Sequence, residues 1–196
     1  MSICPNEPPD GSGVLYLALY RGASGRTVRA ETYLAMDRSE RALVAADLRN
    51  VTISLVVDGR ERLAHQLSLG PLARLVPQIE PARRRLLAGH PALIRSGVLD
   101  VAQGHYLLIE PRAGSDEVTI SLVSIGELPA AAWFPDAPQA DALYDHVAAN
   151  RGPLLAAARQ RADGLAELRV GRAALLDSMA TAAAAGRSLL AEQPQG

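Results

Sequence analysis

The hexapeptide VTISLV occurs twice in this chain of 196 residues, at positions 51–56 and 118–123. Val, Ile and Thr fit the pleated surface of a β-sheet. In each copy Val, Ile and Leu alternate with Thr, Ser and Val, which suits a strand that buries one face. The residues that flank the two copies barely match, so we interpret the repeat as two similar strands and not as a duplicated module. We expect both strands to lie in one antiparallel sheet.

Turn signals beside the two copies predict hairpins. Asp58-Gly59 directly follows the first strand and favours a two-residue turn, which makes it the strongest short hairpin signal in the chain. The second copy is expected to pair with residues 105–110 across a loop over 111–116. A third hairpin is predicted with arms at 14–20 and 28–34. Its first arm is nearly all apolar, as in a central strand or a strand covered on both faces.

Two helical regions are expected to cover the sheet. Segment 37–50 is predicted to form a helix capped by Asp37 or Ser39, although a strand through 42–46 is an alternative. Its apolar face would consist of Leu43, Ala46 and Leu48. Segment 70–98 is predicted to form short helices, because proline suits a first helical position and breaks a helix interior. The prolines concerned are Pro71, Pro77, Pro81 and Pro91.

The C-terminal third of the chain is rich in alanine and predicts helices. Residues 136–150 suit one helix, and about 154–191 suit a longer one whose large apolar residues recur roughly by heptads. We expect this region either to fold back onto the sheet or to project as an oligomerisation arm. In the second case its interface residues would be Leu154, Leu165, Leu168, Leu175, Met179 and Leu189.

These patterns together predict an α+β fold. An antiparallel, hairpin-built sheet of roughly five to seven strands would be covered by short helices and followed by a long Ala-rich helical region. The expected divisions are a disordered N-terminus at 1–12, a sheet domain at 13–135, a helical region at 136–191 and a disordered tail at 192–196.

Charge is balanced over the whole chain but segregated along it. The formal net charge is −1, which provides no global field for nucleic acid or an anionic membrane. Residues 1–99 carry a net +4, residues 100–145 a net −7 and residues 146–196 a net +2. The acidic middle would either pack beside basic parts of the same chain or meet a basic partner.

Several kinds of chemistry are excluded or disfavoured by residue type. All 20 basic residues are arginine, so a lysine Schiff base and a P-loop lysine are absent. Cys4 is the single cysteine, so neither an internal disulfide nor a cysteine zinc site can form within one chain. The N-terminus lacks signal-peptide features, and no apolar run approaches the ~20 residues of a membrane span. We therefore expect a cytoplasmic protein without a cofactor.

Three groups of residues are candidates for a site. The strand and loop at 105–112 place four functional side chains in a short stretch, which suggests a ligand pocket built from His105, Tyr106, Glu110 and Arg112. The run Arg83, Arg84 and Arg85 could bind phosphate. The set Asp141, Asp145 and His146 lacks the spacing of a metal-binding helix, so no metal site is predicted.

No catalytic constellation emerges from these candidates. The leading hypothesis is a non-catalytic protein-interaction module of the adaptor, chaperone or immunity type, oligomeric through its C-terminal helix. The alternative is a small-ligand-binding protein or enzyme with a pocket near His105. A weaker alternative is a nucleic-acid accessory factor that uses Arg83–Arg85, although nucleic acid is not the expected partner.

Overall fold

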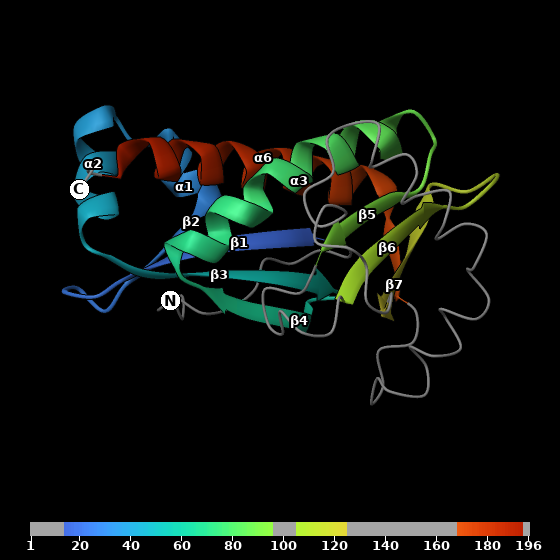
Figure 1. The fold of residues 1–196 in the computed structure, drawn as a ribbon, viewed down its shortest axis with the longest axis horizontal. Helices are drawn as coiled ribbons and strands as arrows, with labels where there is room; N and C mark the ends of the chain where they lie inside the picture. Colours follow the sequence, from blue (N-terminus) through green and yellow to red (C-terminus); the bar gives the residue numbers. More distant parts are fainter. Residues whose placement is uncertain (1–13, 96–104, 125–167, 194–196) are drawn as a thin grey trace. The chain divides into compact units, whose positions relative to one another are not determined.

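A computed structural model of the chain describes residues 14–95, 105–124 and 168–193 (Figure 1). Within these ranges it contains antiparallel sheets, helices and a C-terminal helix, which confirms the predicted α+β class. The chain divides into two compact units. Unit 1 comprises residues 1–83 and 171–196, and unit 2 comprises residues 84–170. This division differs from the expected one, because the C-terminal helix belongs to the same unit as the first hairpins. The expected disordered segment 1–12 lies outside the described residues.

Unit 1 contains a four-stranded sheet in the order β2-β1-β3-β4. Its strands are β1 (Val14–Arg21), β2 (Thr27–Arg29), β3 (Leu48–Val57) and β4 (Arg60–Leu67). Asp58 and Gly59 form the expected turn between β3 and β4, with φ values of 51° and 69°. A two-residue type I′ turn needs such left-handed values at both positions. The first VTISLV is thus a central strand, paired with β1 on one side and β4 on the other.

The register of β1 separates two kinds of side chain. Leu17 pairs with Ile53 and Leu19 pairs with Val51, whereas Tyr20 pairs with Asn50 on the alternate positions. Directly paired residues share one face of a sheet. We call the buried face the leucine face; it carries Leu17, Leu19, Val51, Ile53, Leu55 and Leu67. The opposite face is the tyrosine face; it carries Tyr16, Ala18, Tyr20, Thr27, Arg29, Asn50, Thr52, Ser54 and Gln66.

The second arm of the N-terminal hairpin is shorter than expected. Strand β2 ends at Arg29, and α1 (Ala30–Ala35) replaces the predicted strand through residue 34. Ala30 and Tyr33, one helical turn apart, are 2% and 0% exposed. A helix buries these two side chains together, whereas a strand would place them on opposite faces. Helix α2 (Arg38–Ala46) begins as predicted, with Asp37 accepting from the Glu40 N–H in a capping box. It ends before the predicted residue 50, because Leu48 already belongs to β3.

The prediction of short helices after residue 69 was wrong. Helix α3 (Leu69–Leu87) is continuous, although Pro77 and Pro81 lie inside it. Both prolines are exposed. Between them, the Gln78 side chain donates to the Arg74 carbonyl at 3.0 Å. Each proline costs about 3 kcal/mol in a helix interior, but one helix buries a continuous apolar stripe worth about 1.5–3 kcal/mol per large side chain. That stripe contains Leu72, Leu75, Val76, Ile79, Ala82 and Leu86.

The second VTISLV lies in a different sheet, so the expectation of a single sheet was also wrong. Unit 2 has the strand order β5-β6-β7-β8, from β5 (Ala92–Arg95), β6 (His105–Pro111), β7 (Glu117–Ser124) and β8 (Leu168–Gly171). The hexapeptide occupies β7 and is the second arm of the β6–β7 hairpin, whereas in unit 1 it is the first arm of β3–β4. This difference supports convergence on a good strand sequence over duplication of a module.

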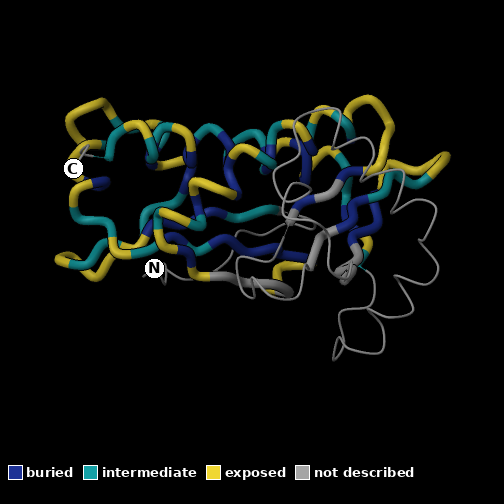
Figure 2. The backbone as a smooth tube through the Cα atoms, in the orientation of Figure 1, coloured by how far each residue is buried: buried dark blue, intermediate teal, exposed yellow. Residues whose placement is uncertain are grey.

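Helix α6 (Arg172–Glu192) is shorter than the helix predicted from residue 154, because residues 168–171 form β8. Val170 is buried and Arg169 exposed, as in a half-buried strand. Helix α6 packs within unit 1, and buried positions recur along its length (Figure 2). Its neighbour α3 runs antiparallel to it, since the Arg83 Nε donates to the Leu176 carbonyl at 3.1 Å and Gly186 faces Val76.

Candidate functional site

The structure describes only part of the predicted ligand site on β6. Positions 105 and 106 are consecutive in a strand and therefore belong to opposite faces of the sheet. Glu110 lies four residues beyond Tyr106, about 13 Å along an extended strand. Arg112 follows the end of β6 and pairs with Glu117 at 3.5 Å. The side chains of His105 and Tyr106 lie outside the described residues, so the proposed pocket stays a prediction.

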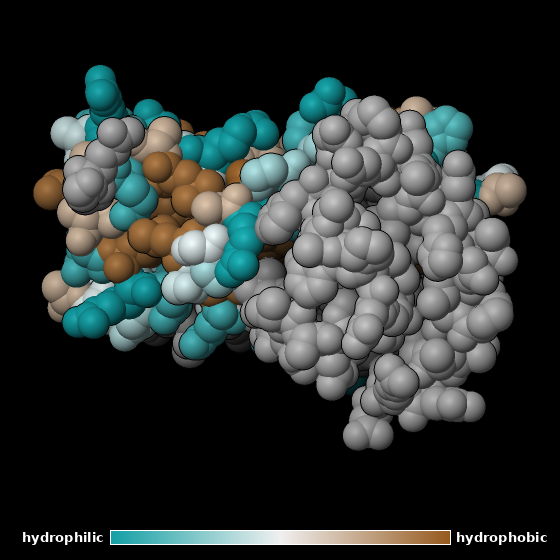
Figure 3. Space-filling view, viewed as in Figure 1, coloured by the Kyte–Doolittle hydropathy of each residue, from teal (hydrophilic) through white to brown (hydrophobic). Residues whose placement is uncertain are grey.

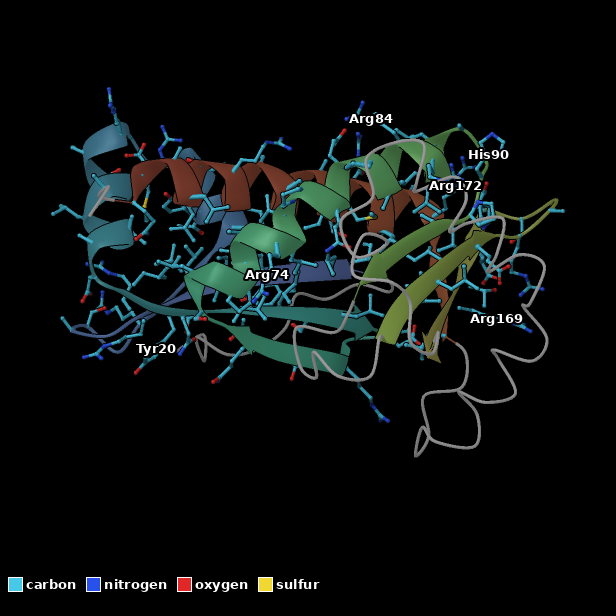
Figure 4. All side chains as sticks on the ribbon, viewed as in Figure 1. Tyr20, Arg74, Arg84, His90, Arg169 and Arg172 are labelled. Carbon is cyan, nitrogen blue, oxygen red and sulfur yellow. The ribbon has the colours of Figure 1, made fainter. Side chains whose placement is uncertain are left out.

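The three consecutive arginines of α3 have different surroundings. Successive helical residues project about 100° apart, and two of the three side chains bind backbone carbonyls. The Arg83 Nε donates to Leu176 at 3.1 Å, and the Arg85 Nε donates to Pro91 at 2.8 Å. Arg84 is exposed (Figure 4). Two of these arginines therefore anchor the helix and its C-terminal loop.

Three of the six apolar residues predicted for an interface in the C-terminal region are core residues. Leu175, Met179 and Leu189 are 2%, 0% and 0% exposed within a single chain. Leu168 lies in β8. An interface through the three buried residues would require α6 to leave unit 1. Two further interface candidates, Leu154 and Leu165, lie outside the described residues, as do Asp141, Asp145 and His146.

The described ranges contain neither a metal-type cluster of side chains nor a helix that could span a membrane. Among those residues, no three His, Cys, Asp or Glu side chains come together as a metal site would require. Over the same residues, no helix has both the length and the hydropathy to span a bilayer.

Helix α2 presents an apolar outer face. Val44 and Ala45 are its buried residues, at 2% and 3% exposure, whereas Leu43 is 66% exposed. Ala42 and Ala46 are also exposed. The apolar stripe that the sequence assigns to the core is therefore largely at the surface. On the face drawn in Figure 3, hydrophobic residues also gather over unit 1 between α2 and the first turns of α3.

The outer face of α2 is held rigidly by the rest of unit 1. The capping box at Asp37 closes the first turn of the helix. Arg41 Nη1 donates to the Ser188 Oγ at 3.1 Å, and Gln193 Nε2 donates to the Ala45 carbonyl at 3.3 Å. Because both contacts reach α6 or its C-terminal end, α2 presents a preformed surface.

A polar cluster is buried where α1, α2 and α6 meet. Tyr33 is fully buried, and among the described residues neither its hydroxyl nor the Arg41 Nε has a hydrogen-bond partner of good geometry. Burial raises the pKa of the Tyr33 phenol, while the nearby Ser188 hydroxyl lowers it in part; Glu192 adds to the rise and Arg41 opposes it. An unsatisfied buried hydroxyl costs stability, so this cluster is a weak point of the core.

Tyr33→Phe is expected to leave stability at neutral pH unchanged or raise it by up to about 1 kcal/mol, because it removes an unpaired buried hydroxyl. In the native protein the folded-state pKa is raised. The neutral phenol therefore contributes fully to the free energy of unfolding below the unfolded-state pKa of about 10. This contribution is lost as the pH rises through the pKa of Tyr33 in the folded state. Urea unfolding at neutral pH and above pH ~10 should show that the variant loses less of its free energy of unfolding at alkaline pH than the native protein does. An equal loss in both proteins would contradict this account.

Sequence reasoning overlooked two surface features that left some signal. The Leu43 stripe was recognised but assigned to the wrong side of α2, because helical periodicity does not indicate which neighbour a face meets. The alternation LYLALY in residues 15–20 separates leucine from tyrosine, yet it reads as a uniformly apolar strand when tyrosine is counted as hydrophobic.

The chain was compared with protein-family models, with curated proteins and with solved structures, and none of the three comparisons gave a significant match.

Proposed function

We propose that this chain is a protein-interaction module that self-associates through the outer face of α2. The supporting observation is the 66% exposure of Leu43, flanked by exposed Ala42 and Ala46 on the same short helix. Large apolar side chains that adjoin other apolar surface often mark protein contacts. The proposal keeps the oligomeric character expected from the sequence but moves the contact from α6 to α2.

Burial of Leu43 would contribute to a contact at this position. Burying a fully exposed leucine is worth about 1.5–3 kcal/mol, and a two-fold contact would bury one Leu43 from each copy. The helix is already ordered by its cap and by its contacts with α6. Association therefore requires little additional ordering of the surface, which lowers its entropic cost. We place the module in the cytoplasm on the ground of its single cysteine.

Leu43→Arg is the direct test. We expect sedimentation velocity over a concentration series to show self-association of the native chain and a dissociation constant raised about tenfold or more in the variant. The reason is that each copy would then place a charge in the apolar contact. Thermal unfolding at concentrations low enough for both proteins to be monomeric should show that Leu43→Arg keeps the native midpoint, because the side chain is exposed in the single chain.

The matched control is Leu87→Arg, because Leu87 is 50% exposed on α3. This variant introduces the same charge on another helix and should associate like the native chain. A native chain that is monomeric at every concentration would refute the proposal. Equal weakening by the two substitutions would refute the assignment of the contact to α2.

A further inference from the structure

The short connection between α2 and β3 binds the turn between β1 and β2. Asp47 directly follows α2, and its carboxylate accepts the Arg21 Nε–H at 3.2 Å and the Ala23 N–H at 3.0 Å. The Asp47 carbonyl accepts the Gly22 N–H at 3.0 Å. The Arg49 side chain lies against Gly22, in the space that a Cβ would fill. Polar contacts and close packing therefore join the C-terminal end of α2 to this turn.

The Arg21–Asp47 pair is the charged part of this connection. The two side chains are 29% and 24% exposed, so water screens their attraction less than it screens that of a fully exposed pair. The two carboxylate oxygens have separate donors, because Oδ2 faces Arg21 and Oδ1 faces the Ala23 N–H. Removal of either charge therefore leaves the other one partly buried without its partner.

Polar contacts near its C-terminal end do much to fix the direction of α2. Of its nine residues, Val44 and Ala45 are the buried ones. A segment with few buried apolar contacts is the kind that moves locally. The Asp37 capping box lies within the helix and its cap, so it does not join α2 to another element. Asp47 follows Leu43 by four residues, about one helical turn, so this end of α2 is fixed close to the exposed leucine.

We propose that the Arg21–Asp47 pair positions the outer face of α2 for self-association. This inference rests on the function proposed above. The pair acts through the direction of the helix that carries Leu43 and does not enter the contact itself. Both copies in a two-fold contact present the same surface, so both need α2 in the same direction. The apparent affinity then falls with the fraction of molecules in which α2 has that direction.

Distances between two spin labels test the positioning within one chain. The labels are attached through Leu43→Cys on α2 and Arg74→Cys on α3 (Figure 4), in a Cys4→Ser background because Cys4 is the single cysteine. At concentrations where the labelled chain is monomeric, pulsed electron paramagnetic resonance should give one narrow distance distribution. Arg21→Ala and Asp47→Asn should each broaden or shift it, whereas Arg21→Lys, which keeps the charge, should preserve it. An unchanged distribution in both charge-removing variants would overturn the proposal.

Sedimentation velocity of the unlabelled chain tests the effect on association. Arg21→Ala and Asp47→Asn should each raise the dissociation constant about threefold or more. The double variant should lose no more than either single variant, because the two substitutions remove the same pair. Arg26→Ala is the matched control, since Arg26 is an exposed arginine beside the same turn and makes no ion pair within the described ranges. Additive losses, or an equal loss from Arg26→Ala, would overturn the proposal.

The two measurements separate this proposal from the function on which it rests. A native chain that is monomeric at every concentration would refute both. Self-association of the native chain with unchanged distances in the variants would refute the positioning role alone. Altered distances without any loss of association would also refute it, because the direction of α2 would then not affect the contact. Circular dichroism checks that each variant is folded, and Asp47→Asn keeps the shape of the side chain if Arg21→Ala does not fold.

Discussion

Gly186→Val is expected to lower the free energy of unfolding of unit 1 by about 3 kcal/mol. A Cβ built on Gly186 would lie 2.5 Å from the Val76 Cγ2 of α3, closer than two carbon atoms can approach. Val76 is 3% exposed and branched at its Cβ, so it has no free rotamer into which to move. Overpacking of this kind costs about 1–3 kcal/mol or more, which exceeds the gain of about 1 kcal/mol from replacing a helical glycine.

Urea unfolding would measure this effect, and two further variants identify its origin. Gly186→Ala should destabilise the native chain but much less so in a Val76→Ala background, because the clash would be absent. Gly70→Ala is the matched glycine control, since nothing lies within 4 Å of the Cβ it would add. It should be neutral or slightly stabilising. If Gly186→Ala behaves like Gly70→Ala, α3 and α6 do not pack as closely as described.

Leu189→Ala is expected to cost about 2–5 kcal/mol, whereas Leu190→Ala should cost about 1 kcal/mol or less. Leu189 is fully buried, so the truncation removes apolar burial and leaves a cavity. Leu190 is the next residue of the same helix and is only partly buried. The two variants make the same substitution at neighbouring positions, so the difference between them shows which side of α6 faces the core.

Protein concentration distinguishes this account from an oligomerisation arm. A loss of stability within one chain is the same at every concentration, whereas an interface leucine makes the unfolding midpoint depend on concentration. The free energies of unfolding of the two variants should differ by the same amount over about a hundredfold range of protein concentration. Such a range would shift the unfolding midpoint of an oligomer measurably. Equal costs for Leu189→Ala and Leu190→Ala, or a cost that disappears on dilution, would contradict the packing of α6 in unit 1.

Much of the fold, but little of the proposed α2 surface, could be predicted from the sequence. The heptad-like recurrence of Leu175, Met179 and Leu189 correctly indicated one buried stripe, because periodicity records which residues share a helix face. It did not indicate whether that face meets its own sheet or another chain.

The sequence by itself determined the features whose causes lie within a few residues. The Asp58-Gly59 turn follows from the left-handed conformation that such pairs accept. The start of α2 follows from Asp37 and Glu40, which satisfy each other's backbone N–H groups. Both VTISLV strands follow from the preference of β-branched residues for a sheet.

Only the tertiary structure decided the features that depend on distant partners. It placed the two VTISLV strands in separate sheets, turned residues 30–35 into a helix that buries Tyr33, and kept α3 continuous through Pro77 and Pro81. It also exposed Leu43 and brought α6 into the core. The physical reason is that burial of apolar area outweighs local preferences of about 1–3 kcal/mol, and which areas meet is set by contacts between residues far apart in the chain.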